Sequence, residues 1–129
     1  VLETLTRHDA AREPGEAAFY AGDWRGLPDA LAADGEEPFD VVLAAETAYR
    51  EDTAAGCVEA LAKLLRPGGL GLLATKRYYF GCGGGTAALE AAVEKHAGLC
   101  CEVVLSHEDG KSNVRDVLEV RWEDEMDVG

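Results

Sequence analysis

Two strand patterns in this chain each end in side chains that could do chemistry. The apolar run from Phe39 to Ala45 stops at Glu46, a carboxylate, and Tyr49 follows three residues later. The run 69–75 likewise ends in the segment 76–85, which holds a lysine, an arginine, three aromatic residues and a glycine triplet. In open α/β sheets, ligands lie at the carboxyl ends of strands. The pattern therefore favours a ligand-binding α/β enzyme.

The elements around these side chains alternate between helix and strand. Apart from Asp40, the run Phe39–Ala45 is continuously apolar, which is typical of a central strand covered on both faces. The segment 66–69, Arg-Pro-Gly-Gly, is a strong helix stop signal. Residues 108–110 predict a tight turn between the last two strands. We predict helices at 1–11, 28–33, 51–65 and 86–96, and strands at 16–21, 39–45, 70–75, 100–106 and 114–122.

This order predicts an α/β fold with a Rossmann-like sheet. Its crossovers should be right-handed, its strands mostly parallel, and its C-terminal hairpin antiparallel. The 129 residues form one domain or part of one, and an apolar fraction of 47% is enough for a core. We assign 1–122 to this domain and 123–129 to an acidic tail.

The charge of the chain limits its partners. Twenty-five acidic and twelve basic residues give a formal net charge of −13. Nucleic-acid binding normally needs a basic surface, so no nucleic-acid partner is expected. The acidic surface would suit a basic protein, or it simply keeps an alanine-rich domain soluble.

The cysteines and histidines do not have metal-ligand spacing, so no metal site is expected. Without a CxxC pair, the cysteines are expected to be buried free thiols in a reducing compartment. No window is apolar enough to span a membrane. We expect a cytoplasmic or nuclear location. The cysteines of the chain are Cys57, Cys82, Cys100 and Cys101, and its histidines are His8, His96 and His107.

Four segments of the chain resemble one enzyme family: 19–24, 39–49, 64–69 and 76–85. They are similar to the second half of the seven-β-strand (class I) S-adenosylmethionine (SAM)-dependent methyltransferases. Within that class they most resemble the histidine protein methyltransferases, a branch near the lysine-modifying enzymes. The resemblance extends from Ala18 to Trp122. Its specific part is the run Tyr79-Phe-Gly-Cys-Gly-Gly-Gly85, since Pro-Gly-Gly after a helix is common to many methyltransferases.

One departure from the family concerns the cofactor site. The family's glycine-rich loop, which approaches the methionine part of SAM, has no counterpart here, and neither does the acidic residue that holds the ribose hydroxyls. Gly83–Gly85 lies after a later strand and cannot substitute. We expect these 129 residues to be the C-terminal portion of the fold, with half a cofactor site, and to be inactive alone. Either the remainder lies outside them, or the protein is a degenerate relative.

The resemblance implies roles for residues at the cofactor. It places Gly22, Asp23 and Trp24 at the adenine, where a carboxylate can accept the exocyclic amine and an aromatic ring can pack on the base. It also places Ala45 where a small side chain lets the backbone come near SAM. The alternative for Gly22–Trp24 is a turn with a core tryptophan.

The resemblance also implies roles at the substrate. Glu46 and Tyr49 take the place of the family's acidic-x-x-tyrosine motif. For a histidine substrate, Glu46 could hydrogen-bond one ring nitrogen and select the tautomer, while Tyr49 forms a wall or a hydrogen bond. Alternatively, Glu46 caps the next helix. The loop 76–85 would be on the substrate side, or else a flexible connection with its aromatic residues in the core. The substrate-binding residues would be Tyr79, Phe80, Gly83, Gly84 and Gly85.

The function implied is a SAM-dependent protein N-methyltransferase, in particular a protein-histidine N-methyltransferase, and the family suggests a ribosomal protein as its substrate. Transfer would run directly from the sulfonium to nitrogen, with positioning as most of the catalysis. Three alternatives stay open: a lysine methyltransferase of the same fold, a catalytically inactive interaction module, and a structural subunit of a larger assembly.

Overall fold

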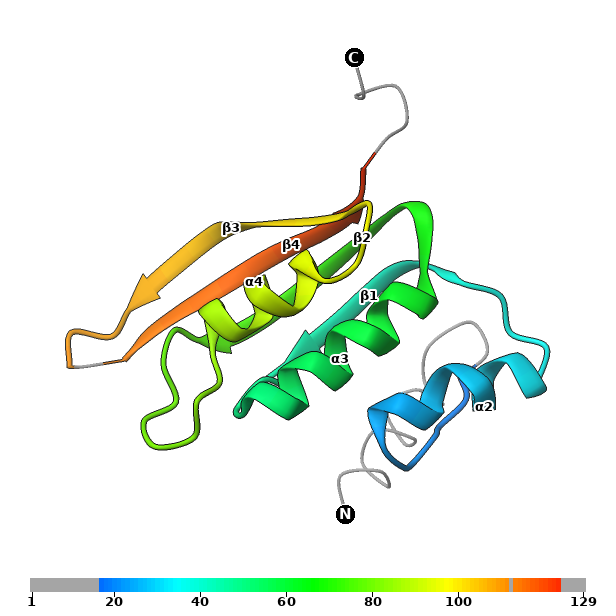
Figure 1. The fold of residues 1–129 in the computed structure, drawn as a ribbon, viewed down its shortest axis with the longest axis horizontal. Helices are drawn as coiled ribbons and strands as arrows, with labels where there is room; N and C mark the ends of the chain where they lie inside the picture. The colour runs from blue at the N-terminus through cyan, green and yellow to red at the C-terminus, as the bar shows by residue number, and fades with distance from the viewer. Residues whose placement is uncertain (1–16, 112, 124–129) are drawn as a thin grey trace.

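The computed structural model describes residues 17–111 and 113–123, which form one mixed sheet with helices on one face (Figure 1). The predicted helix 1–11 and residues 124–129 of the tail lie outside the described residues. The elements are η1 (Trp24–Gly26), α2 (Leu27–Ala33), β1 (Phe39–Ala45), α3 (Glu51–Leu64), β2 (Leu65–Lys76), α4 (Thr86–Glu94), β3 (Leu99–Glu108) and β4 (Val114–Trp122).

The four described strands are arranged in the order β1-β2-β4-β3. β1 runs parallel to β2, while β4 runs antiparallel to both β2 and β3. Three strands therefore point one way and β4 alone is reversed. The prediction of an α/β fold with an antiparallel C-terminal hairpin is confirmed. Because β4 lies between β2 and β3, the hairpin contributes an interior strand to the sheet.

The junction between α3 and β2 follows from its sequence. α3 ends at Leu64, before the predicted stop signal, and Gly68 has a φ of 85°, a conformation that favours glycine. The register with β1 shifts here, from Phe39 opposite Leu65 to Val41 opposite Leu70. The segment 66–69 thus lies in an irregular stretch of β2, across which the parallel pairing with β1 changes register.

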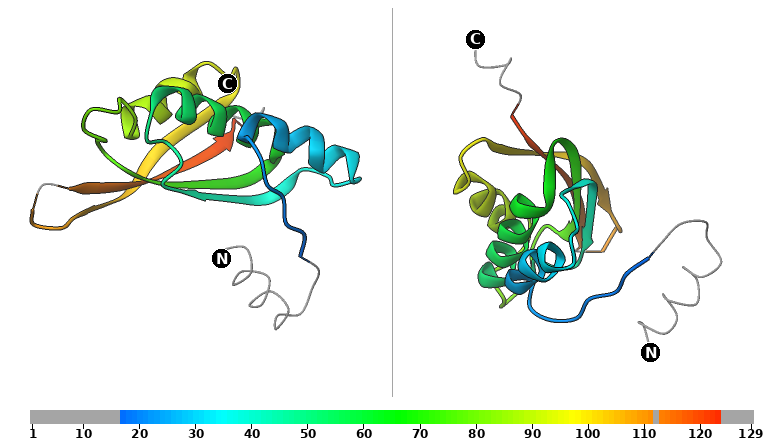
Figure 2. Two further views of the ribbon diagram at one scale, coloured as in Figure 1. Left: turned by 90° about the horizontal axis from the view of Figure 1, so that it is seen from below. Right: turned by 90° about the vertical axis from the view of Figure 1, so that its right-hand side faces the viewer.

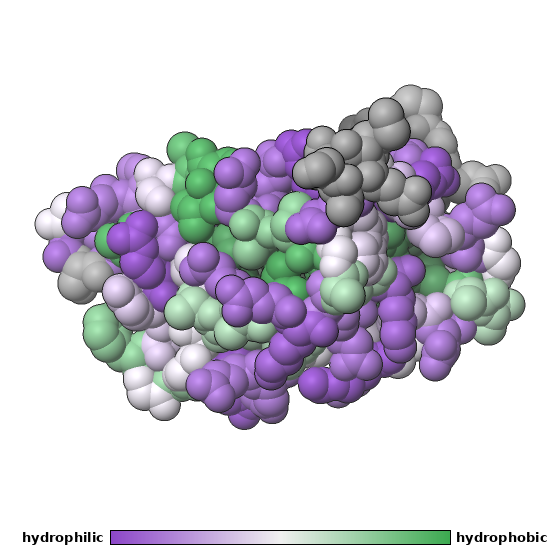
Figure 3. All heavy atoms as spheres, turned by 45° about the horizontal axis from the view of Figure 1, so that its top comes forward, coloured by the Kyte–Doolittle hydropathy of each residue, from purple (hydrophilic) through white to green (hydrophobic). Residues whose placement is uncertain are grey.

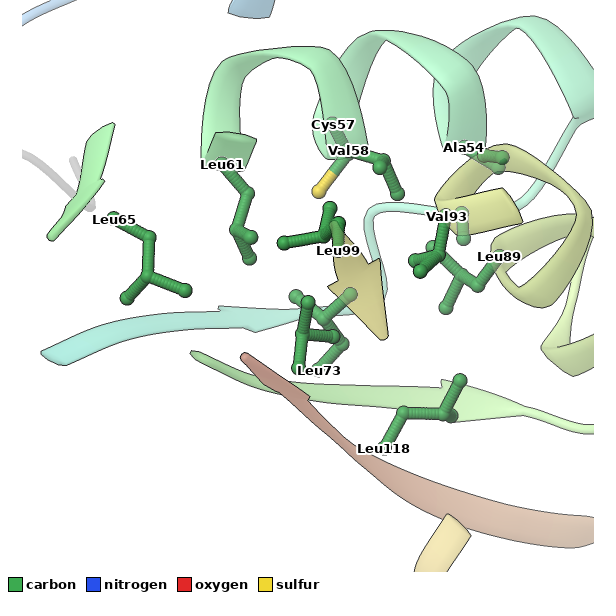
Figure 4. Packing of buried hydrophobic residues seen from close by; sticks show 13 residues of the cluster. Ala54, Cys57, Val58, Leu61, Leu65, Leu73, Leu89, Val93, Leu99 and Leu118 are labelled. Atoms are coloured by element: carbon green, nitrogen blue, oxygen red, sulfur yellow. The ribbon is translucent and has the colours of Figure 1, made fainter. Parts of the chain in front are cut away.

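The core lies between the sheet and the pair α3 and α4 (Figure 2). Side chains of α3 and α4 point toward those of the strands, as Figure 4 shows for Val58 and Leu89 above Leu73 and Leu118. These four side chains are almost wholly buried. Small residues such as Ala54 and Ala92 fill the remaining space, so the helices lie close to the sheet and to each other.

The opposite face of the sheet is open in the described part of the chain. Leu43 is 70% exposed and Val41 is also exposed, although both are apolar. β1 pairs with β2 alone among the described strands, so the prediction of a central strand covered on both faces is wrong for this structure. A continuous apolar run predicts a strand that other elements can pack against on both faces. Whether they do so depends on how the rest of the chain folds.

The predicted strand 16–21 is also wrong: the described residues 17–21 precede η1 without strand structure. An aromatic-rich run becomes a strand only when a neighbouring strand satisfies its backbone groups. Here the segment leads directly into η1, and Tyr20 donates a hydrogen bond to the carboxylate of Asp34 at 2.7 Å.

The surface view mixes hydrophilic and hydrophobic residues, with hydrophilic ones covering much of the face shown (Figure 3). Among the described residues, none of the helices has the length and apolar character needed to cross a bilayer.

Candidate functional site at the carboxyl ends of β1 and β2

Glu46 follows β1 directly and has a backbone conformation that is rare for a residue with a side chain. Its φ is 58°, in the left-handed region, and its N–H donates to the carbonyl of Ala74 at 3.0 Å. That region is sterically unfavourable for residues other than glycine. Such strained residues cluster at functional sites, which supports the selection of Glu46.

The side chain of Glu46 is bound by Tyr79. The Tyr79 hydroxyl donates to Oε2 of Glu46 at 2.6 Å, a short hydrogen bond to a carboxylate. Burial, together with this bond to Glu46, raises the pKa of the Tyr79 phenol, which therefore stays protonated and remains a donor. The structure thus joins a predicted catalytic residue, Glu46, to a predicted substrate-binding residue, Tyr79.

A third side chain, Arg115 of β4, approaches from the neighbouring strand. Its Nε lies 3.9 Å from Oε1 of Glu46, and both side chains are about half exposed. Arg115 is not among the site residues predicted from the sequence. The register places Arg115 opposite Lys76 at the end of β2, and the order of strands along the chain does not reveal that pairing. Glu46 therefore has a hydrogen-bond donor on one oxygen and a guanidinium beside the other.

The alternative that Glu46 caps the next helix is wrong. The N-cap of α3 is Arg50, whose N–H donates to the Thr53 hydroxyl at 3.0 Å. Glu46 is thus separated from the helix it would have capped. Its contacts are with Ala74 and Tyr79, at and just after the end of β2, and with Arg115 near the start of β4.

The other aromatic residues that follow β1 and β2 are exposed. Tyr49 is 43% exposed and the guanidinium carbon of Arg50 lies 5.2 Å from its ring centroid. Tyr78 and Phe80 are strongly exposed, with ring centroids 6.4 Å apart. The alternative that these loop aromatics lie in the core is wrong for Tyr78 and Phe80. Exposed aromatic rings of this kind suit contact with another molecule.

The glycine triplet packs against the chain's own backbone. A Cβ on Gly84 would lie 2.0 Å from the carbonyl oxygen of Ala48, and one on Gly85 would lie 2.3 Å from that of Arg77. Gly85 also donates from its N–H to Ala48 at 2.8 Å. Glycine is thus needed at 84 and 85 for the loop to lie beside the segment that leads to Tyr49. Contact with a substrate stays a prediction, most directly for the exposed Gly83.

The predicted adenine residues line a separate hollow of about 330 Å³ beside η1. Asp23 caps η1, accepting a hydrogen bond from the Arg25 N–H at 2.9 Å. Trp24 is 41% exposed, so the alternative of a core tryptophan is wrong. Gly22 has a φ of 144°, which turns the chain into η1. η1 is held to α3 by an ion pair between Arg25 and Glu59 at 3.2 Å.

Ala45 lies on the open face of the sheet, in a shallow hollow of about 310 Å³ lined by Leu43, Ala44, Leu72, Ala74 and Val117. This hollow and the one beside η1 share no residue. The described residues therefore bring Ala45 next to Glu46 along the chain, while the adenine residues form a second, separate group.

The cysteines are free, but the prediction that all are buried is wrong, because Cys82 and Cys100 are exposed. Burial raises the pKa of the Cys57 thiol, against a weaker opposing effect of its contact with Thr47. Within residues 17–111 and 113–123, no group of three or more histidine, cysteine or acidic side chains is placed to hold a metal ion.

The site thus has the character of a ligand-binding α/β protein, with polar and aromatic side chains at the carboxyl ends of adjacent parallel strands. The chain is 31% identical over 123 residues to the histidine protein methyltransferase 1 homolog of Dictyostelium discoideum, covering 93% of this chain and 39% of that protein. It is 31% identical over 96 residues to the same-named protein of Bos taurus, covering 73% of this chain and 26% of that one.

For the Rattus norvegicus homolog, the identity is 30% over 90 residues, covering 69% of this chain and 25% of that protein. The chain is therefore a partial homologue of the histidine protein methyltransferases. It spans about a quarter to two-fifths of the length of these curated relatives. No protein-family model matches it.

Proposed function

We propose that the protein is a SAM-dependent protein-histidine N-methyltransferase of the seven-strand class, acting on a protein substrate in the cytoplasm or nucleus. The names of its relatives support the class of reaction. The observation that carries the proposal is the strained Glu46, bound on one oxygen by Tyr79 and approached on the other by Arg115.

The geometry around Glu46 suits an imidazole as the methyl acceptor. An imidazole ring can attack only through a nitrogen that carries a lone pair, so its proton must be on the other nitrogen. Oε1 of Glu46 would accept that N–H, while Tyr79 keeps Oε2 in place. As the new N–C bond forms, positive charge develops on the ring. A fixed carboxylate next to the ring stabilises that charge.

The residues present suit one end of SAM. The hollow beside η1, at about 330 Å³, is at the small end of the range for ligand pockets. It combines a carboxylate, Asp23, with the exposed ring of Trp24, which together match the amine and the face of an adenine. When bound, SAM supplies an electrophilic methyl group on its sulfonium. Ala45, with its small side chain, would let that end approach Glu46.

A carboxylate favours the charged form of a neighbouring lysine ammonium, which has no lone pair. A carboxylate shifts an imidazole in the same direction, but from an ordinary pKa near 6.5 rather than near 10.4, so more of the imidazole stays neutral near pH 7 and histidine is favoured over lysine as the acceptor. The type of methylated residue is therefore a direct test of the role of Glu46.

Two measurements test the proposal. The first is calorimetric titration with S-adenosylhomocysteine, using this chain and a version extended upstream in its natural coding sequence. If neither binds while both are folded, the methyltransferase proposal fails and a non-catalytic interaction module takes its place. Binding by either version supports the cofactor assignment.

The second measurement uses whichever version binds, with SAM and a mixture of ribosomal proteins, followed by amino-acid analysis. We expect methylhistidine. Methyllysine instead would contradict the histidine assignment. Glu46→Gln should lose transfer by on the order of 100-fold while keeping cofactor affinity. Glu37→Gln, in the exposed loop before β1, is the matched control and should be unchanged.

A further inference from the structure

A buried carboxylate outside the Glu46 site binds several elements together. Asp116 of β4 is only 1% exposed, yet it is charged and fully hydrogen-bonded. Arg77 donates to it twice, from Nε at 3.1 Å and from Nη2 at 2.9 Å. The hydroxyls of Thr86 and Ser106 donate at 2.5 and 2.7 Å. A buried charge is costly unless it is satisfied in this way.

Two of the donors to Asp116 come from opposite ends of one loop. Arg77 lies at the start of the loop 77–86 and Thr86 at its end, where α4 begins. Both ends of the loop are therefore bound to one carboxylate on β4, and Ser106 connects the same carboxylate to β3. This loop carries every residue predicted to contact the substrate from the β2 side.

Backbone bonds complete the attachment of the loop. The Arg77 N–H donates to Val114 at 2.8 Å, and the Thr86 N–H donates to Arg77 at 3.3 Å. Isolated bridges join Tyr78 to Gly85 and Arg50 to Gly83. The loop is thus fixed at its base, and its middle, which includes Phe80, extends into solvent.

The charge of Asp116 persists at every physiological pH. The Arg77 guanidinium, aided by Thr86 and Ser106, lowers the pKa of this carboxyl to about 2 against the opposing effect of burial. Charge-assisted bonds to a permanent anion are short and directional, so they define one position for each donor. An apolar residue at 116 would fill the same space without orienting Arg77 and Thr86.

We propose that Asp116 is the positioning residue of the loop 77–86, fixing both of its ends so that Tyr79 meets Glu46. The role builds on the function proposed above and deepens it. Asp116 touches neither cofactor nor substrate in this scheme and acts through Arg77 and Thr86.

Amide hydrogen exchange on this chain tests the positioning role without any need for activity. In Asp116→Asn, the hydrogen-bonded amides of Arg77, Gly85 and Thr86 at the two ends of the loop should exchange at least about tenfold faster, while the α3 amides around Val58 stay protected. Asp109→Asn is the matched control, since Asp109 caps the turn of the same hairpin and lies outside the cluster. It should leave the exchange of these loop-end amides unchanged.

Unchanged loop exchange in Asp116→Asn would overturn the proposal, and so would a uniform rise over the whole chain, which would mean a general loss of stability. Ser106→Ala removes one hydrogen bond from the carboxylate and a longer one from Arg77 Nη2 to the Ser106 hydroxyl, and it serves where the first variant fails to fold. It should give a smaller acceleration confined to the same amides, and no acceleration there would also overturn the proposal.

Methyl transfer provides the second readout. It is measured with the version of the protein that binds S-adenosylhomocysteine, and the pentapeptide Ala-Ala-His-Ala-Ala serves as the substrate probe. Ser106→Ala and Asp116→Asn should raise the KM for the peptide by on the order of tenfold and leave S-adenosylhomocysteine affinity unchanged. An equal loss of cofactor affinity would contradict the role. If the wild type methylates no histidine, the proposed function fails, and loop exchange alone decides the role of Asp116.

Discussion

The left-handed backbone at Glu46 leads to a prediction about stability that needs no cofactor or substrate. Replacing Glu46 by alanine removes the carboxylate and leaves a Cβ in the left-handed region. Replacing it by glycine removes the Cβ as well. Because both variants lose the bond from Tyr79, the difference between them isolates the cost of the backbone conformation.

The magnitude follows from two opposing effects. A Cβ in the left-handed region costs about 1–2 kcal/mol. Glycine lowers the free energy of unfolding by about 0.4–1 kcal/mol relative to alanine, because it increases the entropy of the unfolded chain. We therefore expect Glu46→Gly to be more stable than Glu46→Ala by about 0.5–1 kcal/mol. For a chain of 129 residues this is roughly 2–4 °C in Tm. Packing adds little, because the Glu46 side chain is 52% exposed.

Urea unfolding followed by circular dichroism measures the difference. Glu90 in α4 supplies the control, since it is exposed and helical, and glycine there should be less stable than alanine by about 1 kcal/mol. The order of the two variants should thus reverse between positions 46 and 90. The same order at both positions would refute the view that Glu46 is strained. Glu46→Gly should also abolish methyl transfer, because it removes the carboxylate. The strained residue would then also be the one that the reaction needs.

Three further predictions concern stability. Gly84→Ala should lower the free energy of unfolding by more than about 2 kcal/mol, because the new Cβ would lie 2.0 Å from the carbonyl of Ala48; a tolerated substitution in urea unfolding would contradict this packing. Leu118→Ala, at a fully buried position between β2 and β3, should cost about 2–5 kcal/mol in the same assay, and a loss under 1 kcal/mol would mean that the core lies elsewhere. For Asp116, whose pKa is lowered to about 2, the carboxyl should contribute about 2 kcal/mol that is present above its unfolded pKa near 4 and lost as the pH falls through about 2. Unfolding at pH 6 and pH 2.5 should therefore show the advantage of the wild type over Asp116→Asn shrinking, and an unchanged difference would argue against the depressed pKa.

Much of the secondary structure follows from local sequence. Strand 39–45 was predicted with the bounds that the structure has, and so was strand 114–122. In both, apolar residues repeat over a length typical of strands and polar or turn residues follow. The helices α3 and α4 begin where predicted, and the stop signal at 66–69 ends α3 at Leu64. The segment 17–21 has an equally strand-like composition, yet it leads directly into η1 and forms no strand.

The sequence by itself determined which side chains stand at the ends of strands. Glu46 must follow β1 and the loop 76–85 must follow β2, because hydrophobic runs define where each strand stops. Tertiary structure alone decided which of these side chains meet. Tyr79 binds Glu46 across 33 residues, and Arg115 joins them because β4 inserts beside β2 in one register. A shift of one residue would turn Arg115 to the other face and Asp116 away from the core. Register is set by packing of the whole sheet, which no local pattern encodes.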